Sequence, residues 1–407
     1  MRMAESLASA QYGNHLMEEL IAKKCLQFNL DKSSFIVMGT NKQRKQFQRE
    51  LEKSPLTLCD QKMKEVKTLK FLGDHLSFSL EDSVHQTVLK RVGIAKHTVL
   101  EIRTVIEDIR ADRLGSINVA FNIFEQAILP MVLHNSETWL NITRKTMRIL
   151  DDLFHYFCRT IFRIHTGCPK PSFYWESGSL KIENIILEKK LNFLFHLANL
   201  SIDSLGRQFF DLQEEDSSLP SLLKECREHI DQIGLNFREV SKWQYKRKVK
   251  SYIKKRNKNQ LLEEIRGYKK LNHDELSIEP FERKSYFSCL SLTQARMRFR
   301  VASSFVPTVR GDFSRKYRHK SLSCPGCSKT EQFASPPVVE GEPGEPQTSL
   351  SSVSTNQPAP RDSISHILVC KAYSDIRSSI ELDHRNDEKL ANFFIQVVQR
   401  RIDNGDD

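Results

Sequence analysis

Four residues near the C-terminus have the types and the spacing of a structural zinc site. Cys324 and Cys327 flank a Pro-Gly pair, and this short knuckle points both thiolates at one ion. His366 and Cys370 lie one helical turn apart and complete a Cys3His ligand set. The long segment between the pairs is mostly rich in Pro, Ser, Gly and Glu, so we expect 333–361 to be a disordered insertion. Loop-closure entropy rises only logarithmically with length, so the insertion need not destroy the site; unrelated buried thiols are the alternative.

Adjacent carboxylates recur along the chain, but none is placed for metal-dependent catalysis. Two-metal chemistry needs carboxylates that hold divalent ions across the attacking and leaving oxygens. No pair here sits at a turn between two apolar strands, so we interpret the pairs as solvated helix faces, loops or frayed ends. They include Glu81-Asp82, Asp151-Asp152, Glu214-Glu215-Asp216 and Asp406-Asp407. The chain also lacks a phosphate-binding P-loop, a nucleophile elbow and a zinc-protease motif, so the sequence predicts no catalytic residue.

Positive charge is concentrated in the segment Ser241–Lys258, SKWQYKRKVKSYIKKRNK, which contains nine Lys or Arg and no acid. Such cations neutralise phosphates and release counterions, which gives salt-dependent binding without sequence preference. The interleaved Trp243, Tyr245 and Tyr252 either stack on unpaired bases or anchor the helix to the core. The candidate nucleic-acid-binding residues are Lys246, Arg247, Lys248, Lys250, Lys254 and Lys255. A solvated basic helix and a nuclear localisation signal are the alternatives.

A second basic stretch, 283–320, has Asp312 as its only acid. Its run QARMRFRV alternates apolar and basic residues, which permits a strand with one arginine face, although we favour a helix. Arg296, Arg298 and Arg300 are candidates to line a path for a nucleic-acid backbone together with the first basic segment.

Apolar residues at helical spacing predict that most of the chain is helical. Val84, Val88 and Val92, for example, recur at intervals of one helical turn. We expect helices over 1–28, 82–112, 116–133, 141–165, 175–200, 220–234 and 241–258, and a helix pair over 375–402. The polar stretches 41–65 and 208–219 are expected to be a surface connection and a loop.

Two segments near the N-terminus predict strands. Phe28–Gly39 has turn chemistry at Asp31-Lys32-Ser33 and then a short, mostly buried strand. In Lys67–Ser79, two apolar runs bracket Gly73-Asp74, which indicates a tight hairpin.

The composition fits a soluble globular protein and suggests a polyanionic partner. A length of 407 residues favours two or three domains, and the formal net charge of +11 favours RNA or DNA as a partner. No apolar run is long enough to span a membrane, and the N-terminal stretch lacks the apolar core of a signal peptide. Nine thinly spread cysteines fit a reducing compartment. We therefore expect an intracellular protein, nuclear or cytoplasmic or both.

Taken in order, several motifs resemble the C-terminal part of non-LTR (LINE-type) retrotransposon reverse transcriptases. The Asn29–Ser33 run N-x-D-K-S and the Phe71-Leu72-Gly73 hairpin resemble the end of the palm in that family. Ile128–Trp139 resembles the thumb signature, with His134-Asn135 where the family has Tyr-Gly. The Cys-x-x-Cys…His-x-x-x-Cys pattern, continued through Tyr373 and Arg377, resembles the C-terminal zinc knuckle of these polyproteins.

The resemblance implies a mainly α fold with a small β remnant (α+β). It divides the chain into a palm remnant (1–80), a helical thumb and connection (81–234), a basic nucleic-acid-binding region (235–320) and a zinc knuckle with C-terminal helices (321–407). Lys32 would lie near the incoming nucleotide, and Phe71, Leu72 and Gly73 would shape the grip on the primer terminus. The cofactor would be structural Zn²⁺.

The resemblance further implies that the chain begins just after the catalytic Asp-Asp turn. Mg²⁺ would then bind only with the missing catalytic segment present, and the missing upstream polymerase portion would be a partner. We expect the chain alone to bind primer-template or element RNA and not to polymerise. The alternatives are a domesticated basic RNA- or DNA-binding zinc protein without polymerase activity, and a helical interaction module organised by zinc.

Overall fold

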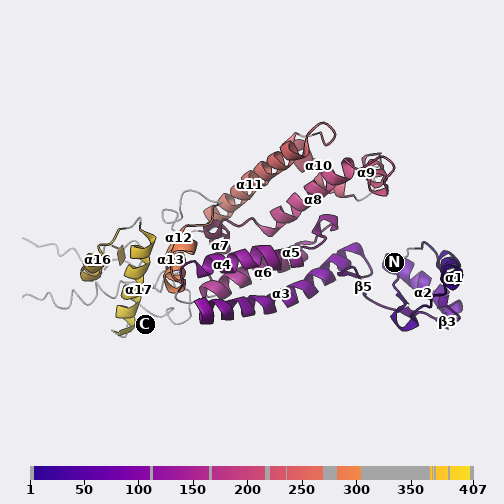
Figure 1. Ribbon diagram of the computed structural model, residues 1–407, viewed down its shortest axis with the longest axis horizontal. Coiled ribbons are helices and arrows are strands. Elements are labelled where there is room, and N and C mark those ends of the chain that lie inside the picture. Colours follow the sequence, from indigo (N-terminus) through magenta and orange to yellow (C-terminus); the bar gives the residue numbers. More distant parts are fainter. Residues whose placement is uncertain are drawn as a thin grey trace, which may run out of the picture. The chain divides into compact units, whose positions relative to one another are not determined.

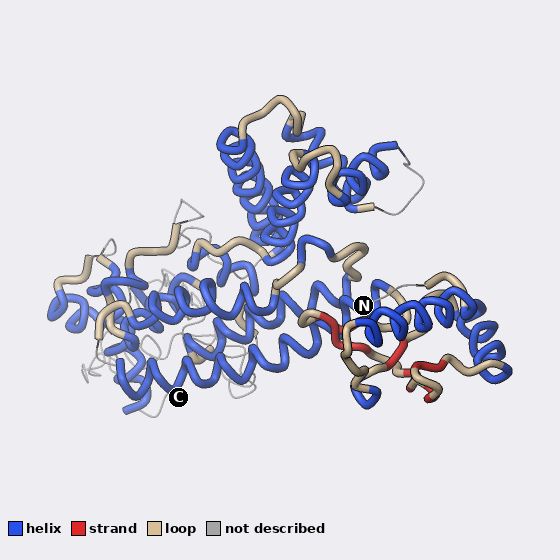
Figure 2. The backbone as a smooth tube through the Cα atoms, turned by 45° about the vertical axis from the view of Figure 1, so that its right-hand side comes forward, coloured by secondary structure: helices blue, strands red, loops and turns tan. Residues whose placement is uncertain are grey.

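The chain is mainly helical, as the sequence predicted, and its few strands are short (Figures 1 and 2). The computed structural model describes residues 4–110, 113–164, 167–215, 221–234, 236–268, 282–303, 367–368, 370, 373–383 and 386–403. Within this part of the chain, no helix combines the length and the apolar character needed to cross a membrane.

The chain divides into two compact units that alternate along the sequence. The first unit comprises Met1–Thr98, Glu125–Phe154 and Lys181–Lys255. The second unit comprises Val99–Phe124, His155–Leu180 and Arg256–Asp407.

The N-terminal part of the first unit contains two helices and three two-stranded sheets. Its elements are α1 (Leu7–Lys23), a 3-10 turn (Leu30–Lys32), β1 (Ser34–Phe35), α2 (Asn41–Lys53), β2 (Thr57–Leu58), β3 (Gln61–Lys62), β4 (Lys64–Glu65), β5 (Leu69–Phe71) and β6 (Asp74–Leu76). β1 pairs with β4 in parallel, whereas β2–β3 and β5–β6 are antiparallel. The stretch 41–65, expected to be a surface connection, contains helix α2. Helix α2 buries no residue, but Thr40 and Gln43 form a capping box that stabilises its first turn.

The predicted hairpin forms, with its turn one residue earlier than expected. Leu72 and Gly73, not Gly73 and Asp74, occupy the two turn positions, because Phe71 pairs with Asp74. Both turn residues have positive φ, 48° at Leu72 and 87° at Gly73, as a type I′ turn requires. The matching twist of this turn closes a hairpin with only three residues in each strand.

The predicted thumb helices are α3 (Leu80–Arg110), α4 (Ser116–Ile123), α5 (Leu129–Val132) and α6 (Arg144–Phe162). Pro130 lacks an N–H and cannot continue an α-helical ladder. The chain accommodates it with a π-helical segment, Phe124–Ile128, directly before α5, and a 3-10 turn, η3 (Ser136–Thr138), follows.

The next helices of the chain are α7 (Lys170–Ser177), α8 (Ile182–Ala198), α9 (Leu205–Glu215), α10 (Leu222–Ile233) and α11 (Lys242–Gly267). The loop prediction for 208–219 was wrong over α9, in which Phe210 is the buried apolar residue that anchors the helix. The helix expected over 175–200 is divided at Gly178, which has a φ of 67°. A Cβ at Gly178 would lie 2.7 Å from the backbone N of Arg283, so a close approach of two chain segments also requires glycine.

The core of the second unit contains a cluster of packed aromatic side chains. Phe162 stacks on Phe299 with ring centroids 4.0 Å apart, Phe299 stacks on Phe173, and Phe121 packs edge-on against Phe157. Phe299 belongs to α13 (Leu292–Ala302), so the run QARMRFRV is a helix. The unit also contains α12 (Tyr286–Cys289), α16 (Ser374–Ile380) and α17 (Asp387–Asp403), and α17 packs along α13.

Candidate nucleic-acid interface

Helix α11 is anchored in the first unit by two of its aromatic side chains. Tyr245 is 1% exposed, stacks on Phe195 with centroids 4.1 Å apart, and donates its hydroxyl to the Leu191 carbonyl at 2.7 Å. Burial raises the pKa of this hydroxyl well above its usual range. The Tyr252 hydroxyl lies 2.7 Å from Gln232 Oε1 and 2.8 Å from His229 Nδ1. These two tyrosines therefore hold the helix rather than meet a ligand.

The predicted cations of α11 are all exposed. Lys246, Lys248, Lys254 and Lys255 have no ion-pair partner among the described residues. The Arg247 guanidinium lies 5.4 Å from the centroid of the Trp243 ring. Burial raises the pKa of Glu188, and the charge of Lys250 acts in the opposite direction. The charges of these four lysines are thus not compensated by ion pairs within the described residues, which favours a polyanion as the ligand of this part of α11.

Trp243 and four of the cations share one face of α11. Residues spaced by three, four, seven and eleven positions project in nearly the same direction from a helix with 3.6 residues per turn. Measured from Trp243, these spacings select Lys246, Arg247, Lys250 and Lys254. We call these five residues the Trp243 face. Lys248 and Lys255 project to a different side.

The hairpin residues predicted to grip a primer present an exposed tip. Leu72 is 76% exposed, Gly73 is exposed beside it, and Phe71 is half-buried in β5. Lys32 is exposed at the end of its 3-10 turn. No contact joins Lys32 to the hairpin among the interactions of the described residues.

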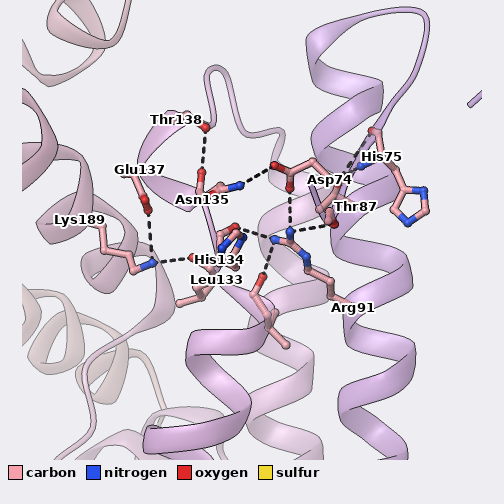
Figure 3. Close-up of polar contacts among 12 residues, drawn as sticks. Asp74, His75, Thr87, Arg91, Leu133, His134, Asn135, Glu137, Thr138 and Lys189 are labelled. Atoms are coloured by element: carbon pink, nitrogen blue, oxygen red, sulfur yellow. Dashed lines mark hydrogen bonds and ion pairs between the residues drawn. The ribbon is translucent and has the colours of Figure 1, made fainter. Parts of the chain in front are cut away.

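A residue that the sequence analysis missed holds the hairpin in place (Figure 3). Arg91 on α3 donates to Asp74 Oδ1 at 2.8 Å, to the Gly73 carbonyl at 3.0 Å and to the His134 carbonyl at 2.6 Å. Asn135 Nδ2 donates to the other Asp74 oxygen at 2.9 Å. In the sequence, Arg91 is a cation within the apolar stripe of a predicted helix, and this position could have indicated a buried, paired arginine. One guanidinium therefore joins the hairpin turn to the loop after α5.

Glu137, in the same loop, is part of an ion pair. Lys189 Nζ on α8 lies 3.3 Å from Glu137 Oε2 and donates to the Leu133 carbonyl at 2.6 Å (Figure 3). This ion pair holds the loop after α5 against α8, so Glu137 has a structural role here.

The three predicted arginines of α13 have partners inside the second unit. Arg296 donates to Glu107 at 2.6 Å and to the Ile161 carbonyl at 2.7 Å. Arg298 donates to Asp387 at 2.6 Å, and Arg300 donates to the Arg163 carbonyl at 3.1 Å. With side-chain exposures of 11% and 14%, Arg296 and Arg298 are less available to phosphates than the cations of α11.

Glu107 accepts hydrogen bonds from three arginines, and this predicts a specific acid sensitivity. Hydrogen bonds from Arg163, then Arg296 and Arg103, lower its pKa from about 4.5 to about 2. A lowered folded-state pKa adds stability above the unfolded-state pKa, and that stability is lost as the pH falls toward 2. We expect Glu107→Gln to destabilise the second unit at pH 7, and the difference from wild type to shrink as the pH falls from about 4.5 to 2. Urea unfolding across this range measures it; a constant difference would contradict this origin.

Of the predicted zinc ligands, Cys324, Cys327 and His366 lie outside the described residues. Cys370 is described and is 2% exposed. Its carbonyl accepts from Arg377 Nη1 at 2.7 Å, and Tyr373 is buried nearby. Within the described part of the chain, no three His, Cys, Asp or Glu side chains are grouped to hold a metal.

Neither a protein-family model, nor a curated protein, nor a solved structure matches the chain.

Proposed function

We propose that this chain is the C-terminal part of a LINE-type reverse transcriptase and binds a nucleic-acid backbone through the exposed cations of α11. The observation that carries the binding proposal is a helix surface on which exposed Lys and Arg have almost no acidic partners. Releasing counterions from phosphates gives such a surface affinity for RNA or DNA without sequence preference. The hairpin tip with Leu72 is a second contact in this proposal, and zinc binding by the Cys3His set remains a prediction from the sequence.

The burial pattern of the first residues supports the proposal of a palm remnant. Among residues 4–79, only Gly13, Leu56, Leu58 and Ser77 are buried. The strands form three separate two-stranded sheets, each with unpaired edges. Sheets this small need further strands or a covering layer to be stable.

Helix α1 offers a surface for such a covering layer. Tyr12, Leu16 and Leu20 recur at intervals of one helical turn and are 65%, 47% and 52% exposed. An apolar stripe of this kind on a helix normally faces a core. The upstream polymerase portion is the partner that our proposal assigns to this stripe.

The binding proposal is tested by removing three lysines from the Trp243 face. We expect Lys246→Ala, Lys250→Ala and Lys254→Ala together to weaken binding of a labelled RNA oligonucleotide roughly tenfold or more in dilute salt. The slope of log affinity against log salt should fall in magnitude by about 2, because each single-strand phosphate contact contributes about 0.7. Fluorescence anisotropy across a salt series measures both quantities.

A matched control removes the same charge from another helix. Lys42, Lys45 and Lys53 are exposed on α2, and their replacement by alanine should change affinity much less. Equal losses in the two triple variants would mean that net charge, not the α11 surface, drives binding. No binding by the wild-type chain in dilute salt would overturn the proposed function and favour an interaction module.

A further inference from the structure

We infer that the Trp243 face selects single-stranded over duplex nucleic acid, with the Trp243 indole stacking on an unpaired base. The inference depends on the proposed function, since it assumes that α11 binds nucleic acid at all. It adds the form of nucleic acid that is preferred and the residue that determines this preference.

The structure distinguishes the aromatic residues of the basic segment by their exposure. Tyr245 is buried on Phe195, and Tyr252 is hydrogen-bonded to Gln232. Trp243 is 67% exposed. Two of the three aromatic residues therefore anchor the helix to the first unit. Trp243 is too exposed to have the same role.

The surroundings of Trp243 suit a nucleobase. Arg247 lies one helical turn away with its guanidinium 5.4 Å from the ring centroid, a cation–π geometry that steadies the indole. Lys246, Lys250 and Lys254 follow along the same face over about 16 Å of helix, at 1.5 Å per residue. A flat aromatic surface beside a row of cations is the usual combination for binding single strands, in which bases stack and phosphates meet Lys and Arg.

Duplex nucleic acid cannot use this indole in the same way. In a duplex both faces of each interior base are already stacked, so the cations can contact phosphates but Trp243 gains no contact with the face of an interior base. Base–aromatic stacking typically strengthens binding by roughly tenfold per base, and we expect a preference of this size for single strands.

The chain provides its own fluorescent reporter for this contact. Of its three tryptophans, Trp139 and Trp175 are 4% and 6% exposed, whereas Trp243 is 67% exposed. Solvent-accessible tryptophan emission therefore comes from Trp243. A base that stacks on the indole should quench this emission.

The experiment titrates the full chain with three probes. These are an oligouridylate of about 20 nucleotides, longer than one typical single-strand site, a duplex RNA of the same length, and phosphatidylserine vesicles. We expect the single strand to quench the exposed emission and the duplex to bind without comparable quenching. We expect Trp243→Ala to weaken single-strand binding roughly tenfold, to leave duplex binding unchanged, and to keep the salt slope. Trp243→Phe, which retains a ring, should lose less affinity.

Each other outcome has a defined meaning. Single-strand binding that Trp243→Ala does not weaken would overturn the inference while leaving the proposed function in place. An equal loss for single strand and duplex would also overturn it. A blue shift of Trp243 emission with vesicles but not with RNA would assign the face to an anionic membrane surface instead. Failure of the wild-type chain to bind either RNA would overturn the proposed function itself.

Discussion

Replacing Arg298 with alanine is expected to lower the free energy of unfolding of the second unit by about 4 kcal/mol, the usual cost of removing one partner from a buried ion pair. Only 14% of the Arg298 side chain is exposed, and it donates to Asp387 on α17 at 2.6 Å. Its guanidinium also lies 5.6 Å from the Tyr286 ring centroid. The substitution therefore removes a contact that joins α13 to both α17 and α12.

The substitution also affects a buried carboxyl group on which Arg298 acts through its charge without touching it. Glu176 is 1% exposed and accepts from the Tyr286 hydroxyl at 2.9 Å. Burial raises the pKa of Glu176, and the charge of Arg298 acts to lower it. In Arg298→Ala we expect the Glu176 pKa to rise further, so the folded state keeps the Glu176 proton to a higher pH than the unfolded state does. Since a raised folded-state pKa removes stability as the pH increases, the destabilisation should be smaller near pH 5 than near pH 8.

Unfolding of the second unit can be followed separately. Trp175 belongs to this unit and is buried, so a Trp139→Phe, Trp243→Phe background leaves it as the single reporter. Urea unfolding in this background compares Arg298→Ala with its parent. Adding Glu176→Gln to Arg298→Ala should restore part of the stability and remove the extra pH dependence.

An exposed arginine–aspartate pair in the same unit provides the control. Arg400 pairs with Asp375, but their side chains are 34% and 64% exposed. Arg400→Ala should cost about 1 kcal/mol or less, because solvent screens exposed ion pairs. If Arg298→Ala were equally mild, the buried network would not stabilise the unit as described.

The features that local patterns encode were predicted best. Helical spacing of apolar residues located α3, α6, α8 and α17, whose buried faces repeat along the chain. Helix α2 was missed because it has no apolar stripe, although the Thr40–Gln43 capping box was present in the sequence. Helix α9 was missed because only one of its apolar residues, Phe210, is buried, so it has no repeating buried stripe.

The roles of the basic residues could be predicted only in part. The sequence placed cations on α11 and α13 alike, but the acidic partners of Arg296 and Arg298 are Glu107 and Asp387, far away along the chain. Charge clusters alone cannot distinguish a cation that meets solvent from one that meets a distant acid. The same limit left open which aromatic residue of α11 is an anchor and which is exposed.

Replacing Arg91 with alanine is expected to release the hairpin β5–β6 from α3. Arg91 is 8% exposed, and its guanidinium binds Asp74, the Gly73 carbonyl and the His134 carbonyl. A two-stranded hairpin is marginally stable by itself, so it needs these contacts to stay ordered. We expect the hairpin to lose about 3 kcal/mol of local stability, the lower range for breaking a buried pair. Hydrogen exchange of its amides should then be faster by roughly 100-fold.

The neighbouring cation gives the matched control for this substitution. Lys90 is exposed on the same helix, so Lys90→Ala removes the same charge without touching the Asp74 contacts and should leave exchange in the hairpin unchanged. Arg91→Lys keeps the charge but loses the two-pronged geometry, so an intermediate rate is expected. Equal rates of amide hydrogen exchange in Arg91→Ala and the wild type would show that the hairpin is stable without the Arg91 contacts. RNA affinity measured on the same variants separates the two proposed contacts, α11 and the hairpin tip. If α11 alone binds RNA, Arg91→Ala releases the hairpin without weakening RNA binding. If the hairpin also binds RNA, Arg91→Ala lowers the RNA affinity.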